Sequence, residues 1–568
     1  MLARHHLRAR NQGPVRQTVT ETIMVEKGAM VTCGEKLVQL LESHGVDTVF
    51  GIPGNHTVEL YRGLAGSGLR HVSPRHEQGA GFMADGYARA TGRPGVCFLI
   101  SGPGLTNALT PMMQALADSV PMLVISAVAA RHQLGMGEGH LHELPDQRAL
   151  ASQCSRFSHT LMRADELPKV LARAFAVFDS ERPGPVHIEI PLDVITSDAS
   201  HLEIELWPSV APPGPAIAAA DEAAAMLSAA SRPVMVIGGG AVSAADEVLQ
   251  IAERLDMPVV NTVKAKGTLP PGHALAVGSS PSLGAVRQIL LDADLVLALG
   301  TEFGETDFDM LFAGDLVLSC PLIRVDIDAR QLCRNQRPTL AIHADSGEFL
   351  RRLLPLLGPA ATNDGPARVR AVRAALPDEA HYHSQFQDFF ELLQAALPGL
   401  VLVGDSTLPT YYAVWQYEAS APRRYFHSAT GGGTLGYAIP AALGAKLALP
   451  DSPVVALIGD GSAQFTFAEL AAGAAAGVAI AVIIWNNAGY SEIEQGMLAA
   501  GITPVGVDIA APDFVEAAIA LGCAAARATT PESLRRALLD SQSRHVPTVI
   551  EVMQTDFISL PAGGWYRD

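Results

Sequence analysis

The sequence predicts an α/β protein with three doubly wound parallel-sheet domains. Runs rich in valine and isoleucine alternate with alanine- and leucine-rich stretches of helical length, and this alternation is typical of the α/β class. The apolar runs are continuous, as in strands of a parallel sheet that helices cover on both faces. Two stretches rich in proline, glycine and alanine, residues 207–221 and 356–369, interrupt the pattern and divide the chain into three blocks.

Each block repeats one order of elements, in which a strand, a glycine-rich turn, a helix and a second strand follow one another. In the first block we expect these elements at residues 95–100, 101–107, 108–120 and 121–127. In the second block we expect them at 233–237, 238–243, 244–256 and 257–263. In the third block they are expected at 453–458, 459–464, 465–477 and 478–485. A right-handed crossover then makes both strands of a block parallel members of one sheet.

The composition restricts the class of protein. A chain of 568 residues is too long for one core, and 48% apolar with 17% charged residues indicates a globular protein. The net charge of -18 argues against nucleic acid and anionic membranes as partners, because both attract basic patches. No apolar run reaches the roughly 18–20 residues of a membrane span. The six scattered cysteines fit a reduced, cytoplasmic protein without a zinc site.

The two interruptions and the start of the first block set the expected domain boundaries. We expect domains at residues 30–205, 215–355 and 375–560. Residues 1–29 are basic and lack the apolar stretch of a secretory signal. We expect a disordered tail there, with Met24 and Met30 as alternative starts and a transit peptide as the other interpretation.

Two small polar side chains follow neighbouring strands of the third block. Asp460 comes directly after one strand, and Asn487 directly after the next. Loops that follow parallel strands meet at the carboxyl edge of the sheet, where ligands bind. A carboxylate and an amide oxygen suit Mg²⁺, with phosphates completing its coordination. The flanking glycines and the helix start at Ser462 would let backbone N–H groups approach a phosphate.

These motifs resemble those of thiamine diphosphate (ThDP) enzymes, specifically the superfamily of acetolactate synthases and 2-oxo acid decarboxylases. The resemblance covers residues 30–560 and rests on "GDGS" through "NNAGY" in the third block. It also includes "FGIPGN", "PRHEQGAGFMADGYARATGRPGV", "SGPGLTNALTP", "DADLVLALG", "RVDIDAR" and "GGGTLGYAIPAALGAK". It implies a pyrimidine-binding (PYR) domain, a central Rossmann-like domain and a diphosphate-binding (PP) domain, in this order.

The resemblance also implies roles for individual residues. Asp460, Asn487 and the Gly489 carbonyl would bind Mg²⁺. The diphosphate would contact Gly461 and Ser462, and also Ser406 and Thr407 of "VGDSTLPTYY". Leu435 would support the bent cofactor from below, and the Gly433 carbonyl would accept a hydrogen bond from its amino group.

Glu77 is the catalytic residue that the resemblance implies. In the family, the glutamate of "RHEQGA" binds a ring nitrogen of the aminopyrimidine and thereby helps to remove the proton from the thiazolium C2. Without the other motifs, Glu77 would be interpreted as an acid that stabilises a helix start. Relatives supply this glutamate and the metal motif from different subunits, so a homodimer or homotetramer with interfacial active sites is expected.

The substrate is expected to be a small 2-oxo acid, and several positions differ from acetolactate synthases. Asn55 follows "GIPG", and the segment "GEGHLHELPDQ" contains Glu138, His140, His142 and Glu143. Together with neighbouring motifs, this segment looks most like the 5-guanidino-2-oxopentanoate (2-ketoarginine) decarboxylases of arginine catabolism. Acids would suit a guanidinium substrate, and the acids beyond "NNAGY" are Glu492 and Glu494. Asp307 is a more remote candidate acid. His140 or His142 would donate a proton to the product, with His76 and His427 as more remote candidates.

Two alternatives stay open at this point. An acetolactate synthase-like carboligase would use pyruvate, and an inactive cofactor-binding regulatory protein would keep the fold alone.

The "IGGGAV" turn of the middle block lacks a full dinucleotide fingerprint. Relatives bind FAD or ADP in this domain, but we expect a purely structural central domain here.

Overall fold

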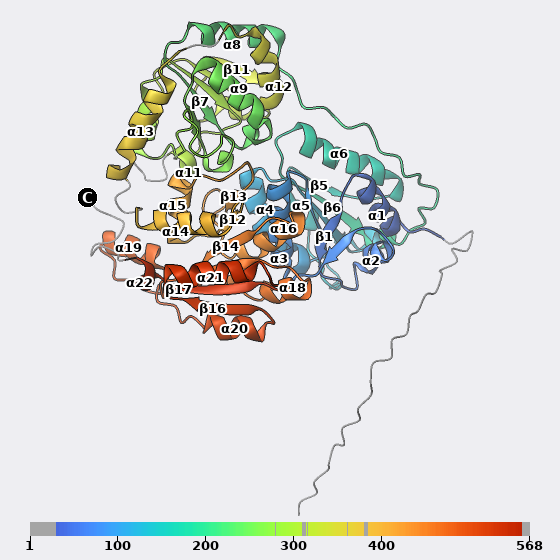
Figure 1. Ribbon diagram of the computed structural model, residues 1–568. Helices are drawn as coiled ribbons and strands as arrows, with labels where there is room; N and C mark the ends of the chain where they lie inside the picture. Colours follow the sequence, from blue (N-terminus) through green and yellow to red (C-terminus); the bar gives the residue numbers. More distant parts are fainter. Residues whose placement is uncertain are drawn as a thin grey trace, which may run out of the picture.

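The computed structural model describes residues 30–278, 280–308, 314, 316–359, 362–379 and 384–558. The expected tail at residues 1–29 lies outside the described residues. Three sheets form three lobes (Figure 1), and all their strand pairs are parallel. The predicted fold class is therefore confirmed.

The first sheet belongs to the N-terminal domain and has the strand order β2-β1-β3-β4-β6-β5. Its strands are β1 (Thr48–Gly51), β2 (Arg70–Val72), β3 (Gly95–Leu99), β4 (Met122–Val128), β5 (Phe157–Thr160) and β6 (Pro185–Pro191). Its helices are α1 (Cys33–Ser43), α2 (Val58–Leu64), α3 (Glu77–Thr91), α4 (Pro103–Asp118), α5 (Gln147–Ser152), α6 (Leu167–Ser180) and α7 (Leu192–Ile195).

The second sheet belongs to the central domain and has the strand order β11-β10-β9-β7-β8. Its strands are β7 (Pro233–Ile237), β8 (Val259–Asn261), β9 (Leu295–Leu299), β10 (Leu322–Asp326) and β11 (Leu340–His343). The helices around it are α8 (Ile217–Ala229), α9 (Ala245–Leu255), α10 (Gly284–Leu291), α11 (Glu305–Phe308) and α12 (Ser346–Leu353). Helix α13 (Gly365–Glu379) packs on α10 and leads to the third domain.

The third sheet belongs to the C-terminal domain and has the strand order β13-β12-β14-β15-β17-β16. Its strands are β12 (Val401–Gly404), β13 (Tyr425–His427), β14 (Val454–Gly459), β15 (Ala481–Asn486), β16 (Ala524–Ala528) and β17 (Thr548–Met553). Its helices are α14 (Ser384–Ala396), α15 (Leu408–Gln416), α16 (Ala438–Ala448), α17 (Asp460–Thr466), α18 (Glu469–Ala475), α19 (Ser491–Ala499), α20 (Phe514–Ala520), α21 (Pro531–Ser541) and α22 (Gln554–Phe557).

The two outer domains share one topology. When the strands of each domain are counted from its own first strand, both outer sheets read 2-1-3-4-6-5, and the central sheet reads 2-1-3-4-5. In each sheet the second strand is added on one side of the first strand, and the third strand is added on the other side. The order of the strands therefore reverses between the first and third strands. Crevices at such a reversal, at the carboxyl ends of the strands, are where open α/β sheets bind ligands.

The outer domains pack against each other through α3 and α16, which lie side by side in Figure 1. Gly86 of α3 lies against the backbone of Ala441, and Gly444 of α16 lies against the backbone of Met83. A side chain at either glycine would force the helices apart, so glycine permits this close approach. The two helices run antiparallel, because the later residue of α3, Gly86, contacts the earlier residue of α16, Ala441, and the earlier residue Met83 contacts the later residue Gly444.

The segments predicted as linkers differ in part from the expectation. Residues 203–216 are irregular, but α8 starts at Ile217, inside the stretch 207–221. Helix α13 starts at Gly365, inside the stretch 356–369, with Pro366 in its first turn. Proline is compatible with the first turn of a helix because the N–H it lacks has no partner there. Within the described residues, no helix is long and apolar enough to cross a membrane.

Candidate active site

The predicted pair Asp460 and Asn487 is brought together by two neighbouring strands. β14 and β15 pair in parallel, with Gly459 opposite Trp485. Asp460 is the first residue of α17, which therefore begins two residues earlier than the sequence suggested, and Asn487 directly follows β15. The short connection through α17 and α18 places both side chains at the same edge of the sheet.

Three oxygen-bearing groups converge at this edge. One end of the Asn487 side-chain amide lies 3.1 Å from Asp460 Oδ1 and 2.8 Å from the carbonyl oxygen of Gly489. Without a cation, the amide nitrogen occupies this end and donates to both oxygens, while the amide oxygen accepts from Ser491 Oγ at 2.9 Å. If the amide turns over, three oxygens face one point, which is the arrangement that a hard cation requires.

The spacing of these groups fits Mg²⁺. Bonds of about 2.1 Å in an octahedron place neighbouring ligands about 3 Å apart, whereas Ca²⁺ bonds of about 2.4 Å would need about 3.4 Å. The observed separations of 3.1 and 2.8 Å are the lengths of two hydrogen bonds, and they are also compatible with an octahedral Mg²⁺ site. Ala488, between the two C-terminal groups, has φ +65°. A non-glycine residue rarely adopts this backbone, and the carbonyl of the next residue, Gly489, lies against the Asn487 amide.

Asp460 is buried, with 1% of its surface exposed. Among the residues that the structure describes, its Oδ2 has no hydrogen-bond partner. Burial raises the pKa of the carboxyl group, while the backbone N–H groups of Asn487, Gly461 and Gly489 act in the opposite direction. A buried carboxylate oxygen without a partner is costly, so a cation bound beside it would stabilise the ionised Asp460.

The predicted diphosphate residues lie at the reversal point of the third sheet, where β12 and β14 are neighbours. Ser406 and Thr407 follow β12, and the Thr407 side chain lies against Gly459. Gly461 packs against the Tyr490 ring, with no room for a side chain. The N–H groups of the first turn of α17 and the loop after β12 thus lie at the same edge of the sheet, where backbone N–H groups could meet an anion.

Asp405 connects the loop after β12 with the first turns of α16 and α17, and it was not predicted from the sequence. This buried carboxyl accepts hydrogen bonds from Ser406 N at 2.8 Å, from Ala438 N at 3.1 Å and from the Ser462 side chain. Burial raises its pKa to about 6, although these donors lower it. The available signal was its position, since an aspartate after a buried strand in "VGDST" repeats the pattern of "IGDGS".

The loop with Gly433 and Leu435 precedes α16. Gly433 is exposed with φ +63° and open space around it, and Leu435 is half-buried. Ser428 Oγ donates to the Thr434 carbonyl at 2.6 Å, which holds the loop against β13. Their proposed contacts with an aminopyrimidine stay predictions.

Glu77 is the first residue of α3 and is half-buried. Asn107 Nδ2, on α4, donates to Glu77 Oε2 at 2.9 Å. Glu77 therefore has the position of an acid that stabilises a helix start, as the alternative interpretation of this residue requires. The Asn107 hydrogen bond also holds its carboxylate in a defined place. Asn107 is a contact that the sequence analysis missed, although it lies in the quoted motif "SGPGLTNALTP".

Glu469, on α18, fixes the segment just before Glu77. Its carboxylate accepts from His76 N at 2.9 Å and from Arg75 N at 3.0 Å. The residue is 1% exposed, and burial raises its pKa to about 7. No sequence pattern connects residues that lie 394 positions apart, so this contact was not predicted.

The predicted substrate residues gather only in part. Asn55 is exposed, next to His56, whose Nδ1 lies 2.6 Å from Ser101 Oγ. The His142 ring packs edge-on against His56 with 5.3 Å between centroids. His140 lies further along the loop, 3.4 Å from Glu138. The structure therefore brings His142, rather than His140, to the loop that carries Asn55.

The remaining candidates have structural partners. Glu143 accepts three backbone N–H bonds from its own loop, from Gly137, Gly139 and His140, so this acid is used locally. The His76 side chain caps α3. His427 is buried, and burial lowers its pKa to about 3, so it would be uncharged near neutral pH and could not act as an imidazolium acid.

Glu492 and Glu494 lie in the first turn of α19, directly after the metal-site loop. Both are half-buried, and Glu494 N donates to the Tyr490 carbonyl at 3.0 Å. Among these two positions, Glu492 lies three and Glu494 five residues after Gly489. Their role in substrate binding stays a prediction.

A cavity of about 480 Å³ lies where the three domains meet. The glycine-rich turn after β7 and the loop after β9 line it at the reversal point of the central sheet. A nucleotide bound at this reversal point would lie in the cavity. The expectation of a purely structural central domain stays a prediction.

Family models match all three domains. The N-terminal TPP binding domain of thiamine pyrophosphate enzymes matches residues 31–150, their central domain matches 220–353, and their C-terminal TPP binding domain matches 404–552. Thiamine pyrophosphate is another name for ThDP. These matches agree with the resemblance inferred from the motifs.

Relatives match over nearly the whole chain. The chain is 43% identical to the probable 2-ketoarginine decarboxylase AruI of Pseudomonas aeruginosa, over 94% of this chain and 96% of the relative. It is 33% identical to the acetolactate synthase isozyme 1 large subunit of Escherichia coli, over 82% and 83%. It is also 33% identical to an acetolactate synthase of Mycobacterium bovis, over 89% and 85%. The chain therefore belongs to the thiamine pyrophosphate enzymes, with decarboxylases and acetolactate synthases as relatives.

Proposed function

We propose that this enzyme decarboxylates 5-guanidino-2-oxopentanoate to 4-guanidinobutanal and CO₂, with ThDP and Mg²⁺ as cofactors. The observation that carries this proposal is the 43% identity to a probable 2-ketoarginine decarboxylase over 94% of the chain, against 33% for the acetolactate synthases above. Because the substrate is the 2-oxo acid of arginine, the reaction would belong to arginine catabolism. Six cysteines without a disulfide support a cytoplasmic location.

The proposed metal ligands are Asp460, Asn487 and the Gly489 carbonyl. The convergence of these three groups supports this assignment, as does an Asp460 Oδ2 that has no hydrogen-bond partner among the described residues. Gly461 and Ser462 would hold diphosphate oxygens at the helix start. Ser406 and Thr407 would do so from the opposite side of the crevice, and Gly433 and Leu435 would position the aminopyrimidine.

Glu77 is the proposed catalytic residue. When bound, ThDP supplies a carbon nucleophile and then an acceptor for the electrons that decarboxylation releases. Glu77 would share a proton with the aminopyrimidine ring nitrogen, which would make the attached amino group more acidic, so that this group could lose a proton and then act as the base toward C2. Asn107 keeps the carboxylate in place through its 2.9 Å hydrogen bond. A proton then has to reach the product, and His142 is the candidate donor.

The geometry of α3 and α4 supports a homo-oligomer. Asp85 binds the Tyr437 hydroxyl, at the end of the cofactor loop, whereas Glu77 lies eight residues earlier on α3, about 12 Å away along the helix. On α4, Asn107 binds Glu77, and Gln114, about 10 Å further along, binds the loop. A chain therefore separates its own Glu77 from its own loop. We propose that Glu77 of the partner subunit completes each site in a homodimer or homotetramer.

Glu492 and Glu494 are proposed to recognise the guanidinium group. A comparison of two substrates that differ only in charge tests this idea. The neutral isostere 2-oxo-5-ureidopentanoate has the same shape as the proposed substrate but lacks its charge. We expect CO₂ release from the cationic substrate to be much faster. Glu494→Gln and Glu492→Gln should each be assayed with both substrates. The variant in which the ratio of the two CO₂ release rates falls identifies the acid that faces the substrate.

The decisive experiment compares substrates in the presence of ThDP and Mg²⁺. The wild type should release CO₂ from 5-guanidino-2-oxopentanoate and form 4-guanidinobutanal in equal amount. Acetolactate formed from pyruvate at a higher rate would instead support the carboligase alternative, which the acetolactate synthase relatives favour. Binding of ThDP without turnover of any 2-oxo acid would support an inactive regulatory protein. Glu77→Gln is the control that should bind ThDP and lose turnover.

A further inference from the structure

The cofactor loop at residues 430–437 is held by side chains of the N-terminal domain. Gly431 lies against the Asp118 carboxylate, and Gly432 lies against Gln114 and Met113, with no space for a side chain at either glycine. At the end of the loop, the Tyr437 hydroxyl donates to Asp85 Oδ1 at 2.6 Å. The loop that carries Gly433 therefore takes its shape from helices α3 and α4.

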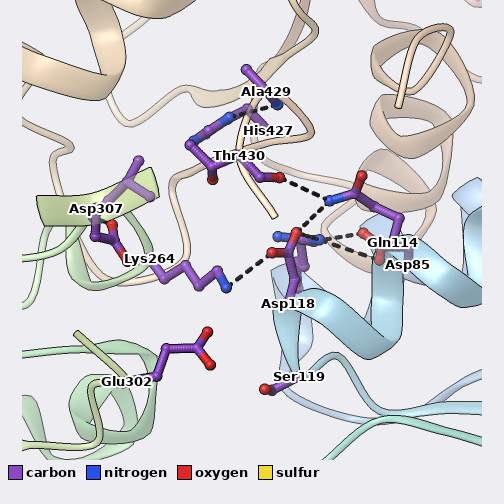
Figure 2. Close-up of polar contacts among 12 residues, drawn as sticks. Asp85, Gln114, Asp118, Ser119, Lys264, Glu302, Asp307, His427, Ala429 and Thr430 are labelled. Carbon is purple, nitrogen blue, oxygen red and sulfur yellow. Dashed lines mark hydrogen bonds and ion pairs between the residues drawn. The ribbon is translucent and has the colours of Figure 1, made fainter. Parts of the chain in front are cut away.

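Gln114 binds both ends of the glycine segment. Its Nε2 donates to the Thr430 carbonyl at 3.3 Å and to Asp118 Oδ2 at 2.7 Å, as Figure 2 shows. Its Oε1 accepts from Thr434 Oγ1 at 2.9 Å and from Thr434 N at 3.3 Å. The side chain is fully buried. One amide thus connects Thr430 and Thr434, the residues on either side of the segment 431–433.

The orientation of this amide depends on the charge of Asp118. An ionised carboxylate only accepts hydrogen bonds, so it forces the Gln114 amide to present its nitrogen. The oxygen of the amide must then face Thr434, which offers two donors. A neutral Asp118 would remove this constraint, because a protonated carboxyl group can itself donate.

Two cations keep the buried Asp118 ionised. Arg89 Nη2 lies 2.6 Å from its Oδ2, and Lys264 Nζ, from the central domain, lies 2.9 Å from its Oδ1. Arg89 also pairs with Asp85 at 2.6 Å, so this one cation bridges two buried carboxylates. Burial would raise the pKa of Asp118, but Lys264 and Arg89 hold it well below its usual range. Figure 2 shows Lys264 reaching Asp118 from the central domain.

We propose that Gln114 is a positioning residue for the aminopyrimidine-binding loop, and that Lys264 of the central domain maintains its orientation through Asp118. This role rests on the proposed ThDP function. The central domain then contributes to catalysis without touching the cofactor. Gln114 fixes Thr430 and Thr434, and the Gly433 carbonyl between them is placed to accept from the cofactor's amino group.

Three variants and one control test this chain of contacts. Gln114→Met keeps the length of the side chain and removes both polar ends. Lys264→Met removes the charge that holds Asp118, and Lys264→Arg restores it. Arg182→Met is the matched control. Arg182 also joins the N-terminal and central domains, through Glu302 at 3.0 Å and Ser119 at 2.8 Å, but it contacts neither Asp118 nor the loop.

Two measurements report on the loop in the full-length protein. The first is amide hydrogen exchange of peptides that cover residues 428–437, in the absence of cofactor. The second is exchange of the C2 proton of ThDP at saturating ThDP and Mg²⁺, with the ThDP dissociation constant measured separately. A displacement of about 1 Å in a reacting group costs roughly a hundredfold in rate. We therefore expect C2 exchange to slow by about ten- to a hundredfold in Gln114→Met and Lys264→Met.

The expected pattern separates positioning from general damage. Gln114→Met and Lys264→Met should exchange loop amides faster and keep ThDP binding within about tenfold of the wild type, because the metal and diphosphate contacts are intact. Lys264→Arg and Arg182→Met should match the wild type. C2 exchange at the wild-type rate in Gln114→Met, or a Lys264→Arg variant as slow as Lys264→Met, would overturn the proposal. If Gln114→Met does not fold, the two Lys264 variants decide alone. A wild type that does not bind ThDP would refute the proposed function instead.

Discussion

Glu469 offers a prediction whose size follows from the structure. The side chain is 1% exposed, and burial raises its pKa from 4.5 to about 7. Its carboxylate accepts from the N–H groups of Arg75 and His76, but these bonds offset only part of the cost of burying a charge. Ionisation is therefore about 3 kcal/mol more costly in the folded protein than in the unfolded chain.

The sign of the pH dependence follows from the raised pKa. The stability contribution of neutral Glu469 is complete below pH 4.5 and is lost as the pH rises through about 7. Glu469→Gln keeps the shape of the neutral acid and cannot ionise. Between pH 5 and 8, the wild type should therefore lose about 2.5 kcal/mol of unfolding free energy relative to the variant.

Chemical denaturation of both proteins without cofactor, followed by tryptophan fluorescence, measures this difference. Trp485 is buried in β15 of the same domain, so it reports the relevant transition. Taking the difference between the two proteins cancels the pH dependence of the other titrating groups. If the wild type and Glu469→Gln lose stability in parallel from pH 5 to 8, the carboxyl group titrates normally and the reasoning is refuted.

Three further predictions concern other parts of the chain. Asp460→Asn should weaken Mg²⁺ binding in the presence of ThDP by more than about tenfold, because it removes the charge that faces the ion; titration calorimetry measures this, and unchanged affinity would refute the metal assignment. Gln147→Leu should destabilise the N-terminal domain by about 2–3 kcal/mol, because Gly102 N and the Glu189 carboxylate lose a buried partner; an unchanged melting temperature would contradict this. A thiol reagent should label the exposed Cys333 before Cys97, whose pKa burial raises to about 12, and mass spectrometry would show the reverse order if this reasoning fails.

The sequence predicted those features that depend on local order. Continuous apolar strands joined by helices specify parallel pairs, and all three repeated strand–turn–helix–strand units are present. Asp460 and Asn487 could be placed together because one short crossover joins their strands, and crossovers have a fixed hand. Family resemblance added Glu77, which no local pattern distinguishes from an ordinary acid at a helix start.

Only the tertiary structure identified the groups that hold these residues in place. Glu469 binds the backbone before Glu77 from 394 residues away, and Gln114 binds Thr434 from 320 residues away. Glu143, an acid that the sequence offered for substrate binding, is occupied by its own loop. Periodicity reports which face of an element is buried. It does not report which polar groups of separate domains meet, because that depends on how whole helices such as α3 and α16 pack.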